Sequence, residues 1–265
     1  MRSVEMKLHP SAHGWRAEFS LVTVCALLGL VYVYGQSNLN FIGFFSNALT
    51  PFEAFAAFAM AVLAWRLNSG KQGGGITRVY LSYSLGIGLW FAAECTWSLY
   101  ALALRVSIPF PSLADVFWLV GYIPLFIALL WQAWPFRQLL GSRKQLVITL
   151  GMFLLALLLL IITIPPILLQ NQGLVAVSVS VAYPLLDTLL LTVAVPVFLI
   201  FRKGSYWRPA LIVILGIVLQ LVGDLAFNQS IMAGTYYSGS PTDLVFDLSY
   251  LMLALGFYRV WKPTS

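Results

Sequence analysis

Residues 145–168 read QLVITLGMFLLALLLLIITIPPIL, a run of 24 positions without a charged side chain. A helix rises about 1.5 Å per residue, so this run is long enough to cross a hydrocarbon core of about 30 Å. Seven further apolar stretches lie at about 17–35, 43–65, 79–104, 112–134, 174–201, 209–233 and 241–260. The pattern predicts an all-α integral membrane protein of eight transmembrane helices, with residues 1–265 as one domain.

The composition agrees with this fold class. Hydrophobic residues make up 60% of the chain and charged residues 9%, whereas soluble domains have about 25% charged residues. No stretch between the apolar segments is long enough to build a separate soluble domain. We therefore expect the lipid bilayer to be the main surroundings of the protein.

The basic residues predict the orientation of the helices. Fourteen of the fifteen lie in the two terminal segments and in alternate loops, and Arg105 is the exception. By the positive-inside rule, both termini and the basic loops are cytoplasmic, and the protein spans the cell (inner) membrane several times. The pI of about 9.4 then reflects topology and anionic lipid headgroups, so we expect no nucleic-acid partner.

Two segments are similar to each other. Residues 111–122 read PSLADVFWLVGY and residues 241–250 read PTDLVFDLSY, and in both a tyrosine follows an acid by seven residues. A second acid lies 21 residues before Asp115 and 19 before Asp243. These correspondences predict two parallel four-helix repeats, at 17–134 and 145–260. The alternative is chance similarity between apolar sequences.

Seven of the nine acidic residues fall inside the hydrophobic segments, from mid-membrane outward: Glu53, Glu94, Asp115, Asp187, Asp224, Asp243 and Asp247. An ionised carboxylate in apolar surroundings loses its hydration, so it must be protonated, paired or in contact with water. Acids within spans are therefore functional-site candidates by default. The alternative is that they hold helices together through hydrogen bonds.

The depth of each acid separates the candidates. Glu94, Asp187 and Asp224 lie deep in their helices, which favours a ligand, cation or proton site, and Asp247 is the next candidate. Asp115 and Asp243 lie at external helix starts, where a carboxylate can cap the helix or form the rim of a site. We place Glu53 near the external start of the second span, as a further cap or rim residue. Arg105 could approach the acids from the external end of the third span.

Aromatic residues accompany the acids. The candidates for a ligand-binding wall are Trp97, Trp118, Tyr122, Tyr183 and Tyr250. Acids combined with aromatic rings suit a small cationic or amphipathic ligand, through charge pairing and cation–π attraction. The alternative is an aromatic belt at the membrane interface.

Several classes of function lack their residues. His9 and His13 both precede the first span, and no lysine lies within a span, which argues against a haem ligated by histidines and against a retinal Schiff base. Phosphate-binding loops, nucleophile elbows and zinc motifs are absent. The sequence therefore gives no catalytic residue and no cofactor, and favours a protein that is not an enzyme. An acid-only site for Ca²⁺ or Mg²⁺ stays open, because these ions take oxygen ligands.

A further similarity is carried by residues 111–122, by YPLLD at 183–187, by GTYYSGSPTD at 234–243 and by Tyr250. Over roughly residues 80 to 260, the chain resembles the multi-span N-terminal sensor region of some bacterial diguanylate cyclases and histidine kinases. The resemblance implies a membrane-embedded unit that senses or binds a ligand. Because the chain ends at Ser265 without a cyclase or kinase domain, we expect a separate signalling partner.

Three functions are consistent with the sequence. The first is a sensory or ligand-binding subunit with an outward-facing acidic and aromatic pocket, which acts through a partner protein. The second is a secondary transporter or proton-coupled carrier, which the parallel repeat would suit. The third is a structural subunit of a larger membrane complex, in which the acids only join helices.

Overall fold

The computed structural model describes residues 14–69, 74–140, 142–169, 173–201 and 207–261. The two histidines and the basic residues Arg2, Lys7, Lys71, Arg202, Lys203 and Lys262 lie outside these ranges. Within them, eight helices are long and apolar enough to cross a membrane. The sequence-based prediction of eight spans is therefore confirmed, and the chain is a multi-pass membrane protein.

The helices follow the apolar stretches with small shifts at their ends. They are α1 (Gly14–Gly35), α2 (Leu39–Asn68), α3 (Gly75–Ser98), α4 (Leu113–Ala133), α6 (Arg143–Leu168), α7 (Leu174–Phe201), α8 (Trp207–Met232) and α9 (Pro241–Trp261). A π-helical stretch, Leu99–Leu104, continues α3, and the short helix α5 (Arg137–Leu140) precedes α6. Helices suit these segments because a bilayer core offers no water to satisfy an unpaired backbone group.

Helix α2 begins earlier than expected, and this moves Glu53. The helix starts at Leu39 after the N-cap Asn38, whose side chain accepts a hydrogen bond from Phe41 N, and it continues through Pro51. Glu53 is thus in the middle of a 30-residue helix. The prediction that Glu53 lies near the start of the span, as a cap or rim residue, is wrong, because the helix begins 14 residues before it and continues through Pro51.

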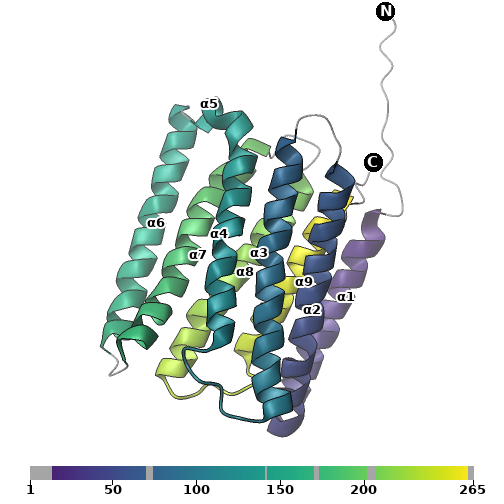
Figure 1. The fold of residues 1–265 in the computed structure, drawn as a ribbon, viewed down its shortest axis with the longest axis vertical. Helices are drawn as coiled ribbons and strands as arrows, with labels where there is room; N and C mark the ends of the chain where they lie inside the picture. Colours follow the sequence, from purple (N-terminus) through teal and green to yellow (C-terminus); the bar gives the residue numbers. More distant parts are fainter. Residues whose placement is uncertain (1–13, 70–73, 141, 170–172, 202–206, 262–265) are drawn as a thin grey trace, which may run out of the picture.

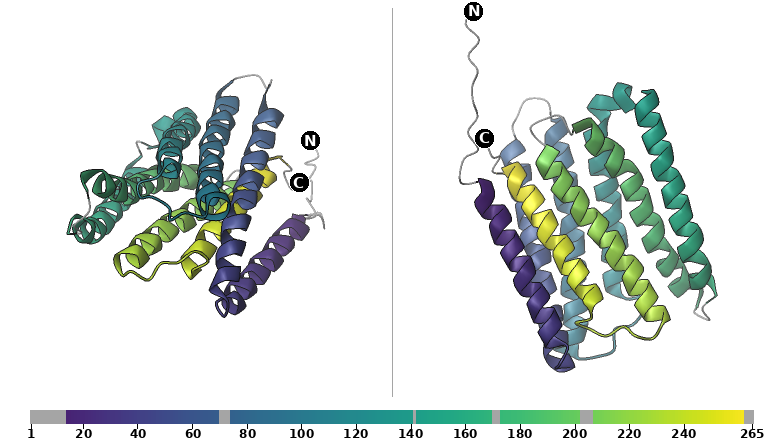
Figure 2. Two further views of the ribbon diagram at one scale, coloured as in Figure 1. Left: turned by 60° about the horizontal axis from the view of Figure 1, so that its bottom comes forward. Right: turned by 180° about the vertical axis from the view of Figure 1, so that it is seen from behind.

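Six of the helices form a closed ring. Contacts run from α2 to α3, α4, α7, α8, α9 and back to α2. Figure 1 shows two facing rows, with α4, α3 and α2 in front of α7, α8 and α9. Helix α1 packs on α9 and α2 at one side, and α6 packs on α7 at the other, as the view from behind in Figure 2 shows. Only 6% of the apolar stretch of α6 is buried, so its surface is available to lipid.

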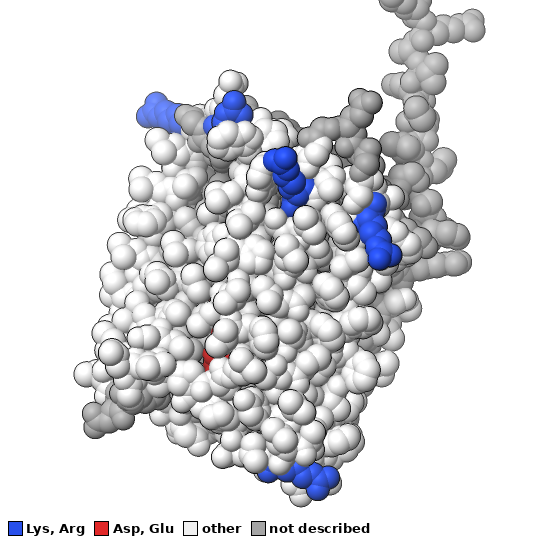
Figure 3. Space-filling model, viewed as in Figure 1, with Lys and Arg blue, Asp and Glu red and all other residues white. Residues whose placement is uncertain are grey.

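Charge is distributed unequally between the two ends of the ring. We call the end with the α2–α3, α4–α6 and α7–α8 connections the basic end; among the described residues it carries Arg66, Arg78, Arg137, Arg143, Lys144 and Arg208. Figure 3 shows basic side chains at this end and a second, smaller basic area at the opposite end, where the chain places Arg105. The surface between the two ends is almost entirely uncharged in this view, apart from a carboxylate that shows through a hollow.

Two pairs of neighbouring helices approach closely at glycines. A Cβ atom on Gly86 of α3 would lie 2.6 Å from Leu125 Cγ of α4. A Cβ atom on Gly216 of α8 would lie 2.8 Å from Leu253 Cγ of α9. Small residues at such contacts let helices pack through van der Waals contact, which drives helix association where lipid removes the hydrophobic effect.

We expect Gly121→Ala to destabilise the protein. A Cβ atom at Gly121 would lie 2.6 Å from Trp90 Cδ1 and 3.2 Å from Gly86 O, so α3 and α4 must move apart. Overpacking of this kind costs about 1–3 kcal/mol, only partly offset by the gain of about 1 kcal/mol from removing a helical glycine. Thermal unfolding in detergent, followed by tryptophan fluorescence, measures the loss.

The matched control is Gly151→Ala in α6, where a Cβ atom meets nothing within 4 Å. This variant should melt at the wild-type temperature or slightly above it. Equal melting temperatures for the two variants would show that the α3–α4 contact has room for a methyl group.

Candidate functional site

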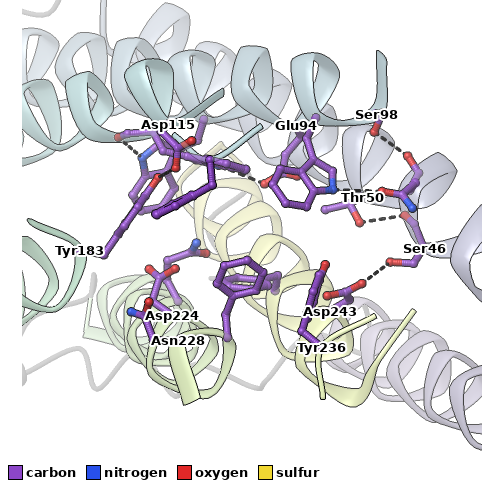
Figure 4. A pocket seen from close by; sticks show the side chains of 18 of the residues that line it. Ser46, Thr50, Glu94, Ser98, Asp115, Tyr183, Asp224, Asn228, Tyr236 and Asp243 are labelled. Carbon is purple, nitrogen blue, oxygen red and sulfur yellow. Dashed lines mark hydrogen bonds between the residues drawn. The ribbon is translucent and has the colours of Figure 1, made fainter. Parts of the chain in front are cut away.

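A pocket lies between the two rows, in the half of the ring away from the basic end. Its cavity volume is about 90 Å³, which is room for a few water molecules or a small ligand group. All six ring helices contribute to its lining, as Figure 4 shows for part of it. The pocket contains four carboxylates, one from each of four helices: Glu94 of α3, Asp115 of α4, Asp224 of α8 and Asp243 of α9.

Glu94 is a buried acid of the pocket that accepts hydrogen bonds from two other helices. It is 7% exposed, and its Oε1 accepts hydrogen bonds from Tyr250 Oη at 2.7 Å and from Trp118 Nε1 at 3.2 Å. The donors come from α9 and α4, so Glu94 joins three helices. The sequence-based alternative of a hydrogen-bonded contact between helices thus fits Glu94, although its carboxylate also faces the pocket.

Asp115 combines a helix cap with a place in the pocket. Ser112 is the N-cap of α4, and Asp115 is the third residue of the helix. Asp115 Oδ2 accepts from Ser112 N at 2.6 Å, which completes a capping box. Its other oxygen, Oδ1, accepts from Tyr183 Oη of α7 at 2.8 Å. The N-cap of α4 is therefore Ser112, and Asp115 is the residue that accepts a hydrogen bond from the backbone of this cap.

Asp243 occupies a similar position in α9. Its Oδ2 accepts hydrogen bonds from Gly239 N at 2.7 Å and from Ser46 Oγ of α2 at 3.0 Å. Tyr236, in the connection before α9, also hydrogen bonds to this carboxylate, and burial together with the charge of Asp243 raises the pKa of the Tyr236 phenol well above its ordinary value. Tyr236 therefore remains a neutral donor.

Asp224 differs from the other three acids. It is 9% exposed and lines the pocket, yet no donor among the described residues reaches its buried Oδ2. A second acid lies beside it, because the carboxyl group of Asp187 in α7 is within hydrogen-bonding reach. Asp224 is thus the carboxylate of the pocket that lacks a neutralising partner.

A second pair of acids lies outside the pocket, between α1, α2 and α9. Asp247 accepts hydrogen bonds from Tyr32 Oη at 2.6 Å and Thr50 Oγ1 at 2.8 Å, and the carboxyl group of Glu53 lies within reach of it. Asp247, the next candidate for the site, is not part of the pocket lining, because it faces Tyr32 of α1 and Thr50 of α2.

Aromatic rings form one wall of the pocket. The Trp97 ring lies 5.8 Å from that of Trp118 and 6.3 Å from that of Phe227, which in turn lies 4.7 Å from Tyr236. Trp97, Trp118, Tyr122 and Tyr183 line the pocket as predicted. Tyr250 lies behind it and reaches it through the bond to Glu94.

The sequence-based prediction did not include several residues that line the pocket: Ser46, Asn47, Thr50, Trp90, Phe110, Gln220, Phe227, Asn228, Tyr236 and Phe246. Ser46 and Thr50 are one helical turn apart, so they face the same side of α2. This spacing was a usable signal, because both residues lie within the apolar stretch 43–65.

The described lining of the pocket has no cationic side chain that could neutralise its four carboxylates. Within the part of the chain that the structure describes, no Lys, Arg or His lines it. Arg105 lines an adjoining groove at the rim instead. Among the described residues, no three His, Cys, Asp or Glu side chains converge in a way that could hold a metal ion, and Glu94, Asp115, Asp224 and Asp243 do not form such a group.

Comparisons with known proteins gave no match, whether with protein-family models, with curated proteins or with solved structures.

We expect Tyr250→Phe to destabilise the protein by about 1–3 kcal/mol, because it removes a hydrogen bond to a buried carboxylate. Chemical or thermal unfolding in lipid nanodiscs measures the loss. The control is Tyr258→Phe on the same helix, whose ring stacks near Trp261; it should leave stability within about 0.5 kcal/mol. Equal losses in both variants would show that the Tyr250 hydroxyl contributes nothing to the contact with Glu94.

Proposed function

We propose that this protein is a membrane-embedded sensory or ligand-binding subunit that takes a small organic cation into the pocket and acts through a partner protein. The observation that carries the proposal is Asp224, a carboxylate that is buried at the pocket wall with one oxygen lacking a donor. A buried anion without a partner is costly. A cationic ligand would supply the missing positive charge.

The lining supports a cation over a neutral or anionic ligand. Four carboxylates face the cavity, while the described lining has no basic side chain to receive an anion. The negative faces of Trp97, Trp118 and Phe227 add cation–π attraction, which is strongest where water is excluded. An organic cation with an apolar body fits both parts of this lining.

The orientation of the pocket follows from the distribution of charge. We propose that the basic end is cytoplasmic, by the positive-inside rule. The pocket lies in the other half of the ring and would then open toward the outside of the inner membrane. A ligand could enter from that side without crossing the bilayer.

We also propose that the eight membrane-spanning helices form two parallel repeats, α1–α4 and α6–α9. The glycine contacts support this, because Gly86 meets Leu125 between α3 and α4, as Gly216 meets Leu253 between α8 and α9. The ring contacts support it as well, since α4 meets α7 where α9 meets α2. The pocket then lies on the axis between the repeats, with Glu94 opposite Asp224 and Asp115 opposite Asp243.

A sensory role through a partner rests on the resemblance to membrane sensor regions and on the exposed outer helices. Helix α1 packs on α9 and α2, and α6 packs on α7, while many apolar side chains of both helices are exposed. A transmembrane helix of a partner could pack on either surface. Loss of signal without loss of ligand binding, after substitutions on these faces, would support this part of the proposal.

A carrier is the second candidate, favoured by a second cavity. This cavity of about 370 Å³ lies toward the basic end and is lined by α3, α4, α7, α8 and α9, which also line the pocket. The hydrophobic core that these same helices form between them includes the buried side chains of Ile87, Leu125 and Leu221. Uptake of radiolabelled choline into proteoliposomes, in a pH gradient, would favour a carrier over a receptor.

We expect choline to bind the purified protein and Asp224→Asn to reduce its affinity at least tenfold, because the variant removes the charge that faces the ligand. Trp90, Trp97 and Trp118 line the pocket, so tryptophan fluorescence reports binding directly. The neutral analogue 3,3-dimethyl-1-butanol has the same shape as choline without its charge and should bind far more weakly.

The control variant is Asp247→Asn, which changes a buried carboxylate outside the pocket lining and should keep the wild-type affinity. Thermal unfolding of both variants checks that they are folded. Equal binding of choline and its neutral analogue, or an unchanged affinity in Asp224→Asn, would contradict a cation site.

A further inference from the structure

Asp187 and Asp224 form a pair of carboxyl groups inside the bundle. Asp187 is 1% exposed and Asp224 9% exposed, and the two groups lie within hydrogen-bonding reach of each other. Asp187 Oδ1 accepts a hydrogen bond from Tyr122 Oη at 2.5 Å. No donor among the described residues reaches the second oxygen, Oδ2, of either acid.

The groups that face this pair supply no positive charge. They are Glu94 from α3, Asp115 and Tyr122 from α4, Tyr183 from α7 and Tyr250 from α9. Each is an acid or a phenol, and the described lining of the pocket has no Lys, Arg or His. Two negative charges on the pair would therefore repel without compensation.

A single proton resolves this conflict. A carboxylic acid can donate a hydrogen bond to a carboxylate, so one proton between two facing carboxyl groups turns repulsion into attraction. The two groups then titrate as a unit, with one proton and one negative charge. The two Oδ2 atoms without donors are the positions that such a proton would join.

We propose that Asp187 and Asp224 share one proton in the empty pocket, and that a cation bound at Asp224 displaces it. Asp224 lines the pocket while Asp187 lies behind it, so the cation meets Asp224 and the proton lies between the two acids. This inference rests on the cation-binding function proposed above and adds the exchange to it.

The exchange conserves charge. Before binding, the pair holds one proton and a single negative charge. When a cation enters, the proton leaves for water through the mouth of the pocket, and the pair carries two negative charges beside one positive ligand. The site with its ligand thus keeps a net charge of −1, and one proton appears in solution.

The consequence is a receptor whose affinity depends on pH. A proton and a cation compete for the same pair of acids, so raising the pH strengthens binding. Over the range in which the empty pair is protonated, the Kd for the cation falls about tenfold per pH unit. A sensor built in this way responds to the ratio of cation to proton at its outer face.

The test uses choline, because its charge does not change with pH. Binding to the protein in nanodiscs is followed by tryptophan fluorescence from pH 5 to pH 8, and proton release is followed with an indicator dye in weakly buffered solution. We expect about one proton released per choline bound. Choline binding to the wild-type protein with no proton release and a constant Kd would overturn the exchange and leave the cation site standing.

Asp187→Asn separates the exchange from the binding site. The amide can donate to Asp224 in place of the shared proton, so Asp224 stays charged and the variant should still bind choline. Its Kd should no longer change with pH, and proton release should disappear. The control Asp247→Asn should keep both. A pH dependence in Asp187→Asn equal to that of the wild type would place the proton elsewhere and overturn the proposal.

The shared proton has a readout that needs no ligand. Infrared spectra of the ligand-free protein should show the carbonyl stretch of a buried protonated carboxyl group, and this band should disappear in Asp187→Asn. A spectrum in which both proteins show the same bands would overturn the exchange even if choline proves too weak a ligand. Failure of choline to bind at any pH, with the band present as expected, would instead count against the cation-binding function alone.

Discussion

Hydrogen bonds from tyrosine hydroxyls to carboxylates on other helices join α1 to α9, α9 to α3 and α4 to α7. Tyr32 of α1 and Tyr250 of α9 bind Asp247 and Glu94, while Tyr122 and Tyr183 bind Asp187 and Asp115 across the contact of α4 and α7. In an apolar bundle the alternative to such a bond is an unsatisfied buried acid, whose cost exceeds the value of the bond itself. The positions of the helices therefore depend on where these acids find their donors.

Asp224 differs from these hydrogen-bonded acids in its surroundings. Neighbouring acids receive donors from tyrosine, tryptophan, serine or backbone groups, whereas Asp224 faces the cavity and a second carboxyl group. A residue that only joined helices would be expected to have a donor of its own. The free-energy cost of burying Asp224 without a donor is thus consistent with a site that is completed by a cation or a proton from outside the chain.

The fold was largely predictable and the site only in part. Uninterrupted apolar runs fix the number of spans, because length and hydrophobicity alone decide whether a helix can cross a bilayer. Trp97, Trp118, Tyr122 and Tyr183 were placed correctly with the acids, since helical spacing puts them on shared faces. Glu53 was misplaced, because its helix begins 14 residues before it. Asp247 was expected as a site residue but faces Tyr32 of α1 and Thr50 of α2, and the sequence does not show which helices pack together.

The sequence by itself determined that the chain crosses a membrane with eight helices and that its acids lie within them, because both follow from local composition and period. Only the tertiary structure decided which acids meet. Asp187 and Asp224 are 37 residues apart and on different helices, and no pattern in the sequence links one to the other. Packing of the ring assigns donors to some acids and pairs these two, since donors and acceptors on separate helices are matched only when the helices are assembled.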